Sequence, residues 1–297
     1  MTESDPPILL ETGFYRLVEG RHGRFLINPR DTVIGRSLAV YGEYSEEECV
    51  VLCQILAPGG VAIEVGTNIG ALTVPLAHHL GPDGLLYAME PQPLIFQQLA
   101  ANLALNDLVN VAAMNMAIGR ESAWIGMARL DPEIEINSGG VPLDQISSQG
   151  EMVRVQIARL DDVIDPPRLD LIKIDVEGME LDVLEGGAAL IQRFRPVLYL
   201  ECNQSASEIL IPKLAELGYK AWWHVPPLFN PENHAGRAED VFPNTYSFNL
   251  LCFPEENAPK VEGLEPVAGP SDHPIRWSGG GAARDALEGG EAHHPLP

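Results

Sequence analysis

The segment of residues 61–70, VAIEVGTNIG, restricts the possible folds of this chain more than any other part of the sequence. A short β-branched run ends in a glycine turn, and residues with helical spacing follow. Gly66 allows a sharp turn beside a ligand, Gly70 lets the helix approach that turn, and the free N–H groups at the helix start then face the ligand. A second predicted strand, Leu85–Met89, leads into Glu90, where a carboxylate can accept hydrogen bonds from both ribose hydroxyls. Together these features predict a nucleoside site at the carboxyl ends of the strands of an α/β sheet.

The residues of the turn also discriminate between nucleosides. A dinucleotide site prefers G-x-G-x-x-G, but Asn68 stands where the second glycine would be, and no Gly-Lys-Ser/Thr follows to form a P-loop. A carboxylate at Glu64 would repel a pyrophosphate, whereas it suits a cationic methionyl group. The pattern E-x-G-x-N-x-G therefore favours S-adenosylmethionine (SAM). The alternative is a purely structural turn in an unrelated α/β protein.

Strand and helix patterns alternate through the centre of the chain. The predicted strands are Val61–Val65, Leu85–Met89, one within 109–118, 169–174, Val197–Glu201 and one within 246–253. One predicted helix starts at Ser45, and the others cover 71–80, 94–105, 179–192 and 209–217. Such alternation is typical of a mostly parallel sheet covered by helices.

The chain is expected to divide into four parts. Residues 1–12 are polar and expected to be flexible, and 13–60 combine short strand patterns with the lead-in helix, which predicts a small β-rich cap. The alternating pattern of the main domain spans 61–253. Residues 254–297 are rich in Gly, Pro, Glu and Ala and are expected to be a disordered tail.

Charge and cysteine content narrow the partners. A formal net charge of −23 disfavours nucleic acid, and no apolar run is long enough to predict a membrane span. The N-terminal residues lack the pattern of a secretory signal, so a cytoplasmic location is expected. The cysteines, which form no C-x-x-C pair, are expected to be buried free thiols in a reducing compartment. They are Cys49, Cys53, Cys202 and Cys252.

Several stretches resemble the FkbM family of SAM-dependent methyltransferases. They are VAIEVGTNIGALTVPLA, YAMEPQP and LIKIDVEGMELDVLEG, with GRSLAVYGEYSEEE and ARLDDVI as weaker matches, so the resemblance runs from about 23 to 254. It implies a Rossmann-like α/β domain with a seven-stranded, mostly parallel sheet, helices on both faces, and methyl transfer, usually to a hydroxyl oxygen. The residues that it assigns to SAM are Glu64, Gly66, Thr67, Asn68 and Gly70 around the methionine part, Glu90 on the ribose, Met116 and Ala117 beside the adenine, and Asp175. Thr67 often corresponds to Ala in the family, and Glu64 to Asp.

Candidate catalytic groups follow the predicted strands. Asp175 and Glu177 lie after the strand at 169–174, at the sheet edge where ligands bind. Glu177 has an alternative role as an acid in the first turn of the next helix. His224 is a second candidate base, in a segment that we expect to fold over the cofactor as a lid. No metal ligand is assigned, although Glu201 and Asn203 are at the same edge and present oxygen ligands that suit a divalent cation.

The leading interpretation is therefore O-methylation of a hydroxyl on a small molecule or glycan. The closest alternative is an N-methyltransferase on the same scaffold. A NAD-binding oxidoreductase is disfavoured by the missing G-x-G-x-x-G, and a non-catalytic module would have lost the cofactor residues that are present here. Fold does not set the acceptor, and the chain could also form a homo-oligomer.

Overall fold

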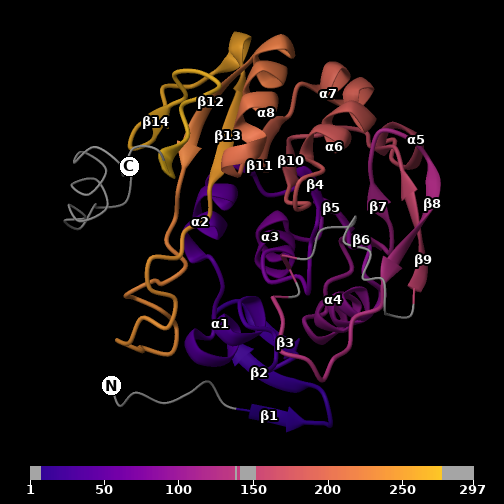
Figure 1. The fold of residues 1–297 in the computed structure, drawn as a ribbon, viewed down its shortest axis with the longest axis vertical. Coiled ribbons are helices and arrows are strands. Elements are labelled where there is room, and N and C mark those ends of the chain that lie inside the picture. The colour runs from indigo at the N-terminus through magenta and orange to yellow at the C-terminus, as the bar shows by residue number, and fades with distance from the viewer. Residues whose placement is uncertain (1–7, 138, 141–151, 276–297) are drawn as a thin grey trace.

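The computed structural model describes residues 8–137, 139–140 and 152–275 of this chain (Figure 1). Its central layer is an eight-stranded sheet in the order β14-β12-β13-β11-β10-β4-β5-β6. Pairing is parallel from β11 to β6 and antiparallel from β11 to β14. The strands are β4 (Val61–Val65), β5 (Leu85–Met89), β6 (Val111–Met114), β10 (Leu171–Ile174), β11 (Val197–Glu201), β12 (Tyr219–His224), β13 (Asn249–Pro254) and β14 (Glu265–Pro266). The expected mostly parallel α/β sheet is confirmed, with the two-residue β14 added at one edge.

Helices cover both faces of this sheet, as expected. Side chains of α2 (Glu46–Ile55) and α3 (Thr73–Leu80) pack on one face, and α6, α7 and α8 pack on the other. These last helices span Glu180–Gly186, Ala188–Phe194 and Gln204–Glu216. Successive residues of β4 alternate between the two faces, because neighbouring side chains of a strand point in opposite directions.

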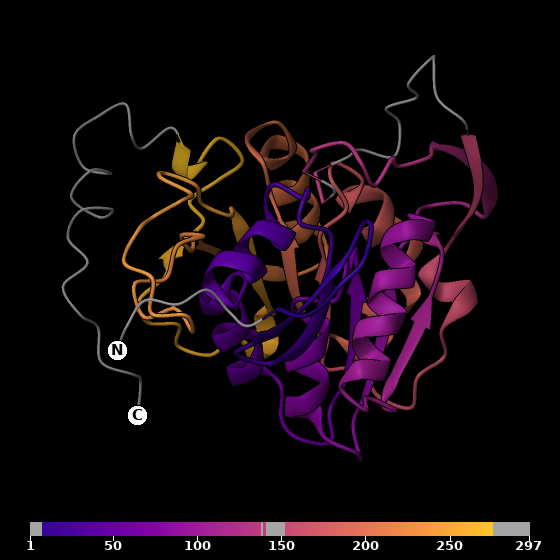
Figure 2. The same cartoon turned by 90° about the horizontal axis from the view of Figure 1, so that it is seen from below.

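Two smaller sheets flank the central one. The N-terminal sheet joins β1 (Ile8–Glu11), β2 (Arg16–Gly20) and β3 (Gly23–Ile27) in antiparallel order, and α1 (Ile34–Tyr41) follows it. This sheet packs beside α4 (Pro93–Leu105), as Figure 2 shows in indigo and magenta. The other small sheet contains β7, β8 and β9 and is followed by the short helix α5. These four elements span Ala117–Ile118, Ala123–Ala128, Met152–Ala158 and Leu160–Val163.

The single helix expected at 179–192 is two helices. Gly187 ends α6 and begins α7, with φ −108° and ψ 15°. The preceding Gly186 lies so close to another segment that a Cβ there would be 2.1 Å from the carbonyl oxygen of Gly119. Close packing against the segment at Gly119 therefore places glycines within the helical pattern, where the chain changes direction.

The first part of the segment expected to be a disordered tail, residues 254–275, is ordered. Residues 254–275 follow the sheet: β14 pairs with β12, and the His273 ring, 1% exposed, lies against Trp223 and Phe248 with centroid distances of 5.0 and 4.9 Å. Aromatic packing holds a segment whose own composition is polar. The remainder of the predicted tail lies outside the described residues. At the other end, residues 8–11 of the segment expected to be flexible form β1.

All four cysteines are free, and three of them are buried, while Cys53 is partly exposed. Among the described residues, no helix has the length and apolar character needed to cross a membrane.

Candidate active site

The candidate site lies at the carboxyl ends of β4 and β10. These neighbouring parallel strands are the point where the strand order reverses: the chain runs outward through β5 and β6 on one side and through β11 on the other. Adjacent connections then diverge to opposite faces and leave a crevice, where open α/β sheets bind their ligands. A cavity of about 210 Å³ opens there.

The glycine turn after β4 is fixed by a close approach of β10. Gly66 has φ +84°, and a Cβ at this position would lie 1.7 Å from the carbonyl oxygen of Asp175. Only glycine combines this conformation with this contact. Asn68, at φ +50°, is one of the few other residue types that tolerate the left-handed region. Gly66 and Asn68 line the cavity, whereas Thr67 and Gly70 stand behind it as parts of the turn.

The amides of this turn have partners within the protein. Each N–H group of residues 66–70 donates a hydrogen bond. The acceptors are the carbonyl of Met89 for the first two, then the carboxylate of Glu90, the side chain of Asn68 and the carbonyl of Thr67. These bonds concern the turn itself, whereas the free N–H groups that the sequence predicted are those of the helix start, and α3 begins only at Thr73. A diphosphate would find the amides of the turn already occupied.

Glu90 lines the cavity and is held rigidly. It is 7% exposed, and its two carboxylate oxygens accept hydrogen bonds from the backbone N–H groups of Asn68 and Gln92, at 3.0 and 2.8 Å. Burial raises the pKa of Glu90 to about 7, against the opposing effect of these two bonds. The remaining lone pairs of an oriented carboxylate suit the pair of hydroxyls on a ribose. Met116 and Ala117, which the resemblance assigns to the adenine, also line this cavity.

Glu64, in contrast, does not reach the cavity. Its side chain lies on the sheet face that α3 covers, because Val65, its neighbour in the strand, points the other way and lines the cavity. The Glu64 carboxylate accepts a hydrogen bond from the Thr73 hydroxyl at 2.8 Å and lies 4.0 Å from Lys173 Nζ. Burial raises the pKa of Glu64 to about 7, and Lys173 opposes that rise. The Glu64 carboxylate therefore contacts Thr73 and Lys173, and it does not line the cavity.

The carboxylates that meet at the cavity come from β10 and β11. Asp175, Glu177 and Glu201 each offer an oxygen, and these oxygens lie within 4.8 Å of one another. Lys173 Nζ bonds to Asp175 Oδ2 at 3.1 Å. Glu177 has a left-handed backbone, φ +52°, which directs this residue back toward its neighbours. The same spacing would accept a divalent cation, the alternative that the sequence raised.

Glu177 does not take the helix-start role that was its alternative assignment. Helix α6 begins at Glu180, and the Glu180 side chain accepts the hydrogen bond from the Gly178 N–H at 3.0 Å. Glu177 therefore belongs to the acidic cluster with Asp175 and Glu201.

Burial and mutual repulsion keep protons on this cluster. Burial, then the neighbouring Asp175, raises the pKa of Glu177 to about 7 and that of Glu201 to about 9. Within the described residues, Glu201 Oε2 is buried and has no hydrogen-bond partner. Burial alone would lower the pKa of Lys173, but the carboxylates around it outweigh burial and raise it, so Lys173 stays charged. At neutral pH the cluster therefore combines a carboxylate able to take a proton with a carboxylic acid able to donate one.

The structure places two other candidates elsewhere. His224 is 5% exposed, its Nδ1 lies 2.8 Å from the Tyr199 hydroxyl, and burial lowers its pKa to about 4. It is absent from the cavity lining, so it is not positioned as the base. Asn203 caps α8, where its side chain accepts a bond from the Ala206 N–H. Neither role is visible in the sequence, because each depends on the direction of one side chain at the sheet edge.

The segment expected to act as a lid packs on the N-terminal part instead. Asn230 Nδ2 donates to one oxygen of Glu43 and the His234 N–H donates to the other, both at 2.7 Å. Glu43, 3% exposed, also accepts from Arg21 at 2.6 Å. The lid hypothesis is therefore not supported.

Sequence reasoning missed several residues of the cavity lining. Glu48, which is 4% exposed, lines it from α2 and lies 3.3 Å from Asn249 Nδ2. Ser247 and Asn137 line it as well, together with Tyr44, which the sequence did raise as a residue near the cofactor. The acids at 46–48 were interpreted only as a helix start. The sequence pattern does not show that one of them, Glu48, is buried.

The ligand-free protein is expected to lose stability between about pH 6 and about pH 8. The folded pKa of Glu201, about 9, exceeds its unfolded value of about 4.3. The contribution of Glu201 to the free energy of unfolding is thus fully present below the unfolded pKa, and it is lost as pH rises through the folded pKa. Over this interval the loss amounts to roughly 2 kcal/mol. Denaturant titrations at both pH values measure it. Glu201→Gln cannot ionise and should lose less, and equal losses in the two proteins would contradict this assignment.

Comparisons with known proteins agree with the geometry. The family model described as "Methyltransferase FkbM domain" matches residues 64–221, just over half of the chain. "Methyltransferase 1" of Beauveria bassiana is 28% identical over 143 residues, which cover 42% of this chain and 57% of that protein. "Methyltransferase sdnD" of Sordaria araneosa is 28% identical over 177 residues, 50% of this chain and 67% of that protein. The chain thus spans between half and two thirds of these curated relatives.

Two solved structures also align with this chain. The methyltransferase FkbM of Methylobacillus flagellatus aligns with 15% identity and a TM-score of 0.43, over 68% of this chain and 50% of that one. TYW2 of M. jannaschii, solved in complex with AdoMet, aligns with 16% identity and a TM-score of 0.43, over 84% of this chain and 90% of that one.

Proposed function

Because the chain belongs to the FkbM family of SAM-dependent methyltransferases, we propose that it methylates a hydroxyl oxygen of a small molecule or glycan. The observation that carries this proposal is the acidic cluster of Asp175, Glu177 and Glu201 beside the cavity. A hydroxyl must lose a proton as it becomes an ether, and a positioned carboxylate is a suitable acceptor for that proton.

The residues at the cavity fit SAM. Glu90 is buried and oriented by two backbone bonds, which leaves its outer lone pairs for the ribose hydroxyls. Gly66 provides the close backbone approach beside the methionine part. The occupied amides of the turn provide no cradle for the phosphates of a dinucleotide. Cofactor contacts are therefore proposed for Gly66, Asn68, Glu90, Met116 and Ala117, with Thr67 and Gly70 shaping the turn.

The sign of the charge at the cavity supports the same cofactor. Five acidic residues line it: Glu48, Glu90, Asp175, Glu177 and Glu201. No Lys or Arg is among the described lining residues, although Lys173, which bonds to Asp175 from outside the lining, offsets part of this negative charge. Acids in a partly buried cavity attract a cation and repel a diphosphate. On the sequence alone, the preference for a cation was based on Glu64. In the structure, the same preference rests on the acids that line the cavity.

When bound, SAM supplies a methyl group on a positively charged sulfur, which departs as a neutral thioether. We assign to Glu177 the role of accepting the acceptor's hydroxyl proton, since a pKa of about 7 is matched to neutral pH. Asp175, held by Lys173 at 3.1 Å, orients the hydroxyl, and the protonated Glu201 can donate a hydrogen bond to the acceptor. Holding the nucleophile in line is worth up to about 7–11 kcal/mol of the barrier in favourable cases.

Calorimetry with SAM, its demethylated product and NAD tests the cofactor assignment. Binding of SAM and its product without binding of NAD is expected, and binding of NAD alone would overturn the proposal. A panel of acceptors in which a hydroxyl is replaced by an amine on the same scaffold, with radiolabelled SAM, tests the acceptor atom. Methylation of only the amines would favour the N-methyltransferase alternative.

Glu90→Gln is expected to weaken SAM binding by about 10–100-fold, because hydrogen bonds to a charged group contribute about 1.5–3 kcal/mol. Isothermal titration calorimetry measures the dissociation constant. The matched control is Glu133→Gln, an exposed acid that is absent from the cavity lining and should bind SAM like the unmodified protein. Equal affinities for the Glu90 variant and the control would remove the ribose contact.

A further inference from the structure

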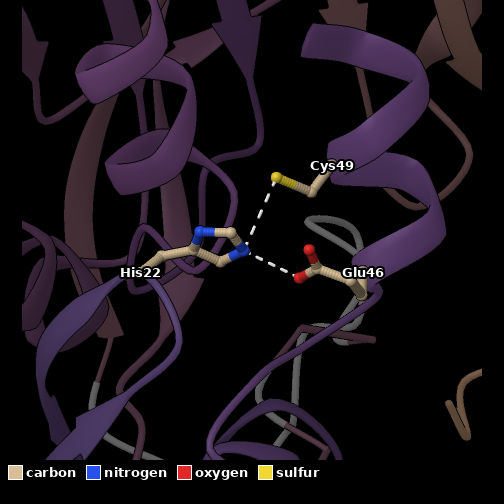
Figure 3. A group of neighbouring side chains, drawn as sticks. All are labelled: His22, Glu46 and Cys49. Atoms are coloured by element: carbon tan, nitrogen blue, oxygen red, sulfur yellow. Dashed lines mark hydrogen bonds and ion pairs between the residues drawn. The ribbon is translucent and has the colours of Figure 1, made fainter. Parts of the chain in front are cut away.

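A second cluster of ligand-type side chains lies away from the cavity, between the N-terminal sheet and α2. His22 comes from the turn that joins β2 and β3, and Glu46 and Cys49 come from the first turns of α2 (Figure 3). The His22 Nε2 atom lies 2.7 Å from Glu46 Oε2 and 3.8 Å from Cys49 Sγ. The three ligand atoms all lie within 4.8 Å of one another. Residues 27 positions apart in sequence are thus aimed at one point.

The donor set has the composition of a transition-metal site. Imidazole nitrogen, thiolate sulfur and carboxylate oxygen are the three donor types that zinc takes in proteins, at about 2.0–2.3 Å from the metal. In a tetrahedron of that size, neighbouring ligand atoms are about 3.5 Å apart. The distance from His22 to Cys49 already has this value to within a few tenths of an ångström. The pair of His22 and Glu46 is closer and would separate by less than about 1 Å to admit the ion.

The burial and surroundings of the cluster fit a structural metal site. Cys49 is buried, at 3% exposed, while His22 and Glu46 are partly buried, so an ion can enter from their side. Cys53 follows Cys49 by one helical turn and is in hydrogen-bond contact with it, which places a second sulfur next to the first. Arg21 has its shorter contact with Glu43, at 2.6 Å, and lies 3.7 Å from Glu46.

We propose that His22, Glu46 and Cys49 bind a zinc-type divalent transition-metal ion, with water or Cys53 in the fourth position. On binding, the Cys49 thiol releases its proton to solvent and the sulfur bonds to the metal as a thiolate, while His22 coordinates as the neutral ring. The site lies outside residues 64–221 that match the methyltransferase domain, and it does not depend on the reaction proposed above.

The ion would fasten the β2–β3 turn to α2. That helix carries Glu48, and the residue Tyr44 stands just before it; both line the cavity. The proposed ion therefore stabilises the wall of the cavity without lining the cavity itself. It holds that wall in position and takes no part in the reaction.

The test uses the full chain, freed of metal by a chelator and then titrated with Co²⁺ or Zn²⁺. One equivalent of Co²⁺ per chain is expected to bind with a thiolate-to-cobalt charge-transfer band and the visible bands of a tetrahedral ion. Cys49→Ser should abolish the charge-transfer band, and His22→Gln should lower the affinity by more than the 10–100-fold that loss of an outer partner costs. His78→Gln and Cys252→Ala, at an exposed helical histidine and a buried strand cysteine, are the matched controls.

Thermal unfolding provides a second readout. Zn²⁺ should raise the melting temperature of the chelator-treated protein and should leave that of His22→Gln almost unchanged, because an ion that binds only the folded chain stabilises it. Cobalt bound without a sulfur band, a band that survives Cys49→Ser, or equal zinc stabilisation of His22→Gln and His78→Gln would each overturn the proposal. Since His22 is partly exposed, its variant should fold even if the Cys49 variant does not.

Discussion

Glu177→Gln is expected to lower kcat by about 10²–10⁴-fold, because it removes the group that accepts the hydroxyl proton. SAM affinity should change little, since the residues assigned to the cofactor are left intact. The unmodified protein should gain kcat/KM as pH rises through about 7, where Glu177 becomes a carboxylate, and the variant should lack this rise. Initial rates with radiolabelled SAM across this pH range measure both effects.

The stability of the Glu177 variant separates chemistry from folding. Removing one of three crowded acids should leave the free energy of unfolding unchanged or slightly higher, since like charges disfavour the folded state. The exposed Glu133→Gln variant again serves as the control for rate. Asp175→Asn, which replaces the charged acceptor of the Lys173 bond by a neutral amide oxygen, should also lose more turnover than stability. A Glu177 variant that keeps the wild-type rate and pH profile would move the base to another residue.

Gly66→Ala is expected to have the largest effect on structure of any single methyl group in this site. The added Cβ would lie 1.7 Å from the Asp175 carbonyl oxygen, so the ends of β4 and β10 must separate. A left-handed backbone, φ +84°, adds its own cost of about 1–2 kcal/mol. We expect a loss of at least about 4 kcal/mol in unfolding free energy, together with loss of SAM binding.

The control for Gly66→Ala is Gly236→Ala. Gly236 has a similar φ, +67°, but a Cβ there would meet nothing within 4 Å. Gly236→Ala should therefore lose only the stability that the left-handed backbone costs, and it should retain SAM binding. Denaturant titration and calorimetry on both variants separate the two contributions. Similar losses of stability in both would show that the clash is relieved by a small movement and that the close approach at Gly66 is not essential.

The sequence predicts best the elements that are marked by a local pattern of residues along the chain. The boundaries of β4 and β5 were predicted correctly, because short β-branched or apolar runs end at clear turn residues. The helix at 94–105 begins one residue earlier than predicted, at Pro93. The helix at 179–192 was predicted as one unit, because periodicity does not report that Gly186 lies against Gly119.

The candidate site shows the same division. Gly66 and Glu90 follow from spacing along the chain, and the structure brings both to the cavity. Glu64 was placed around the methionine part of SAM, but its side chain lies outside the cavity lining, since the direction of a strand residue depends on its register with neighbouring strands. His224 and Glu48 were misjudged because their roles depend on partners far away in sequence, Tyr199 and Asn249.

The short strand β14 has a consequence for how these molecules meet one another. Strand β12 would otherwise end the sheet with a row of unpaired backbone groups, and β14 covers it at Trp222 and Trp223. The new boundary is only two residues long and includes Pro266, which has no N–H to donate. A boundary of this kind offers almost no template for another chain to extend the sheet, which protects a hydrophobic, Trp-containing strand from intermolecular β-aggregation.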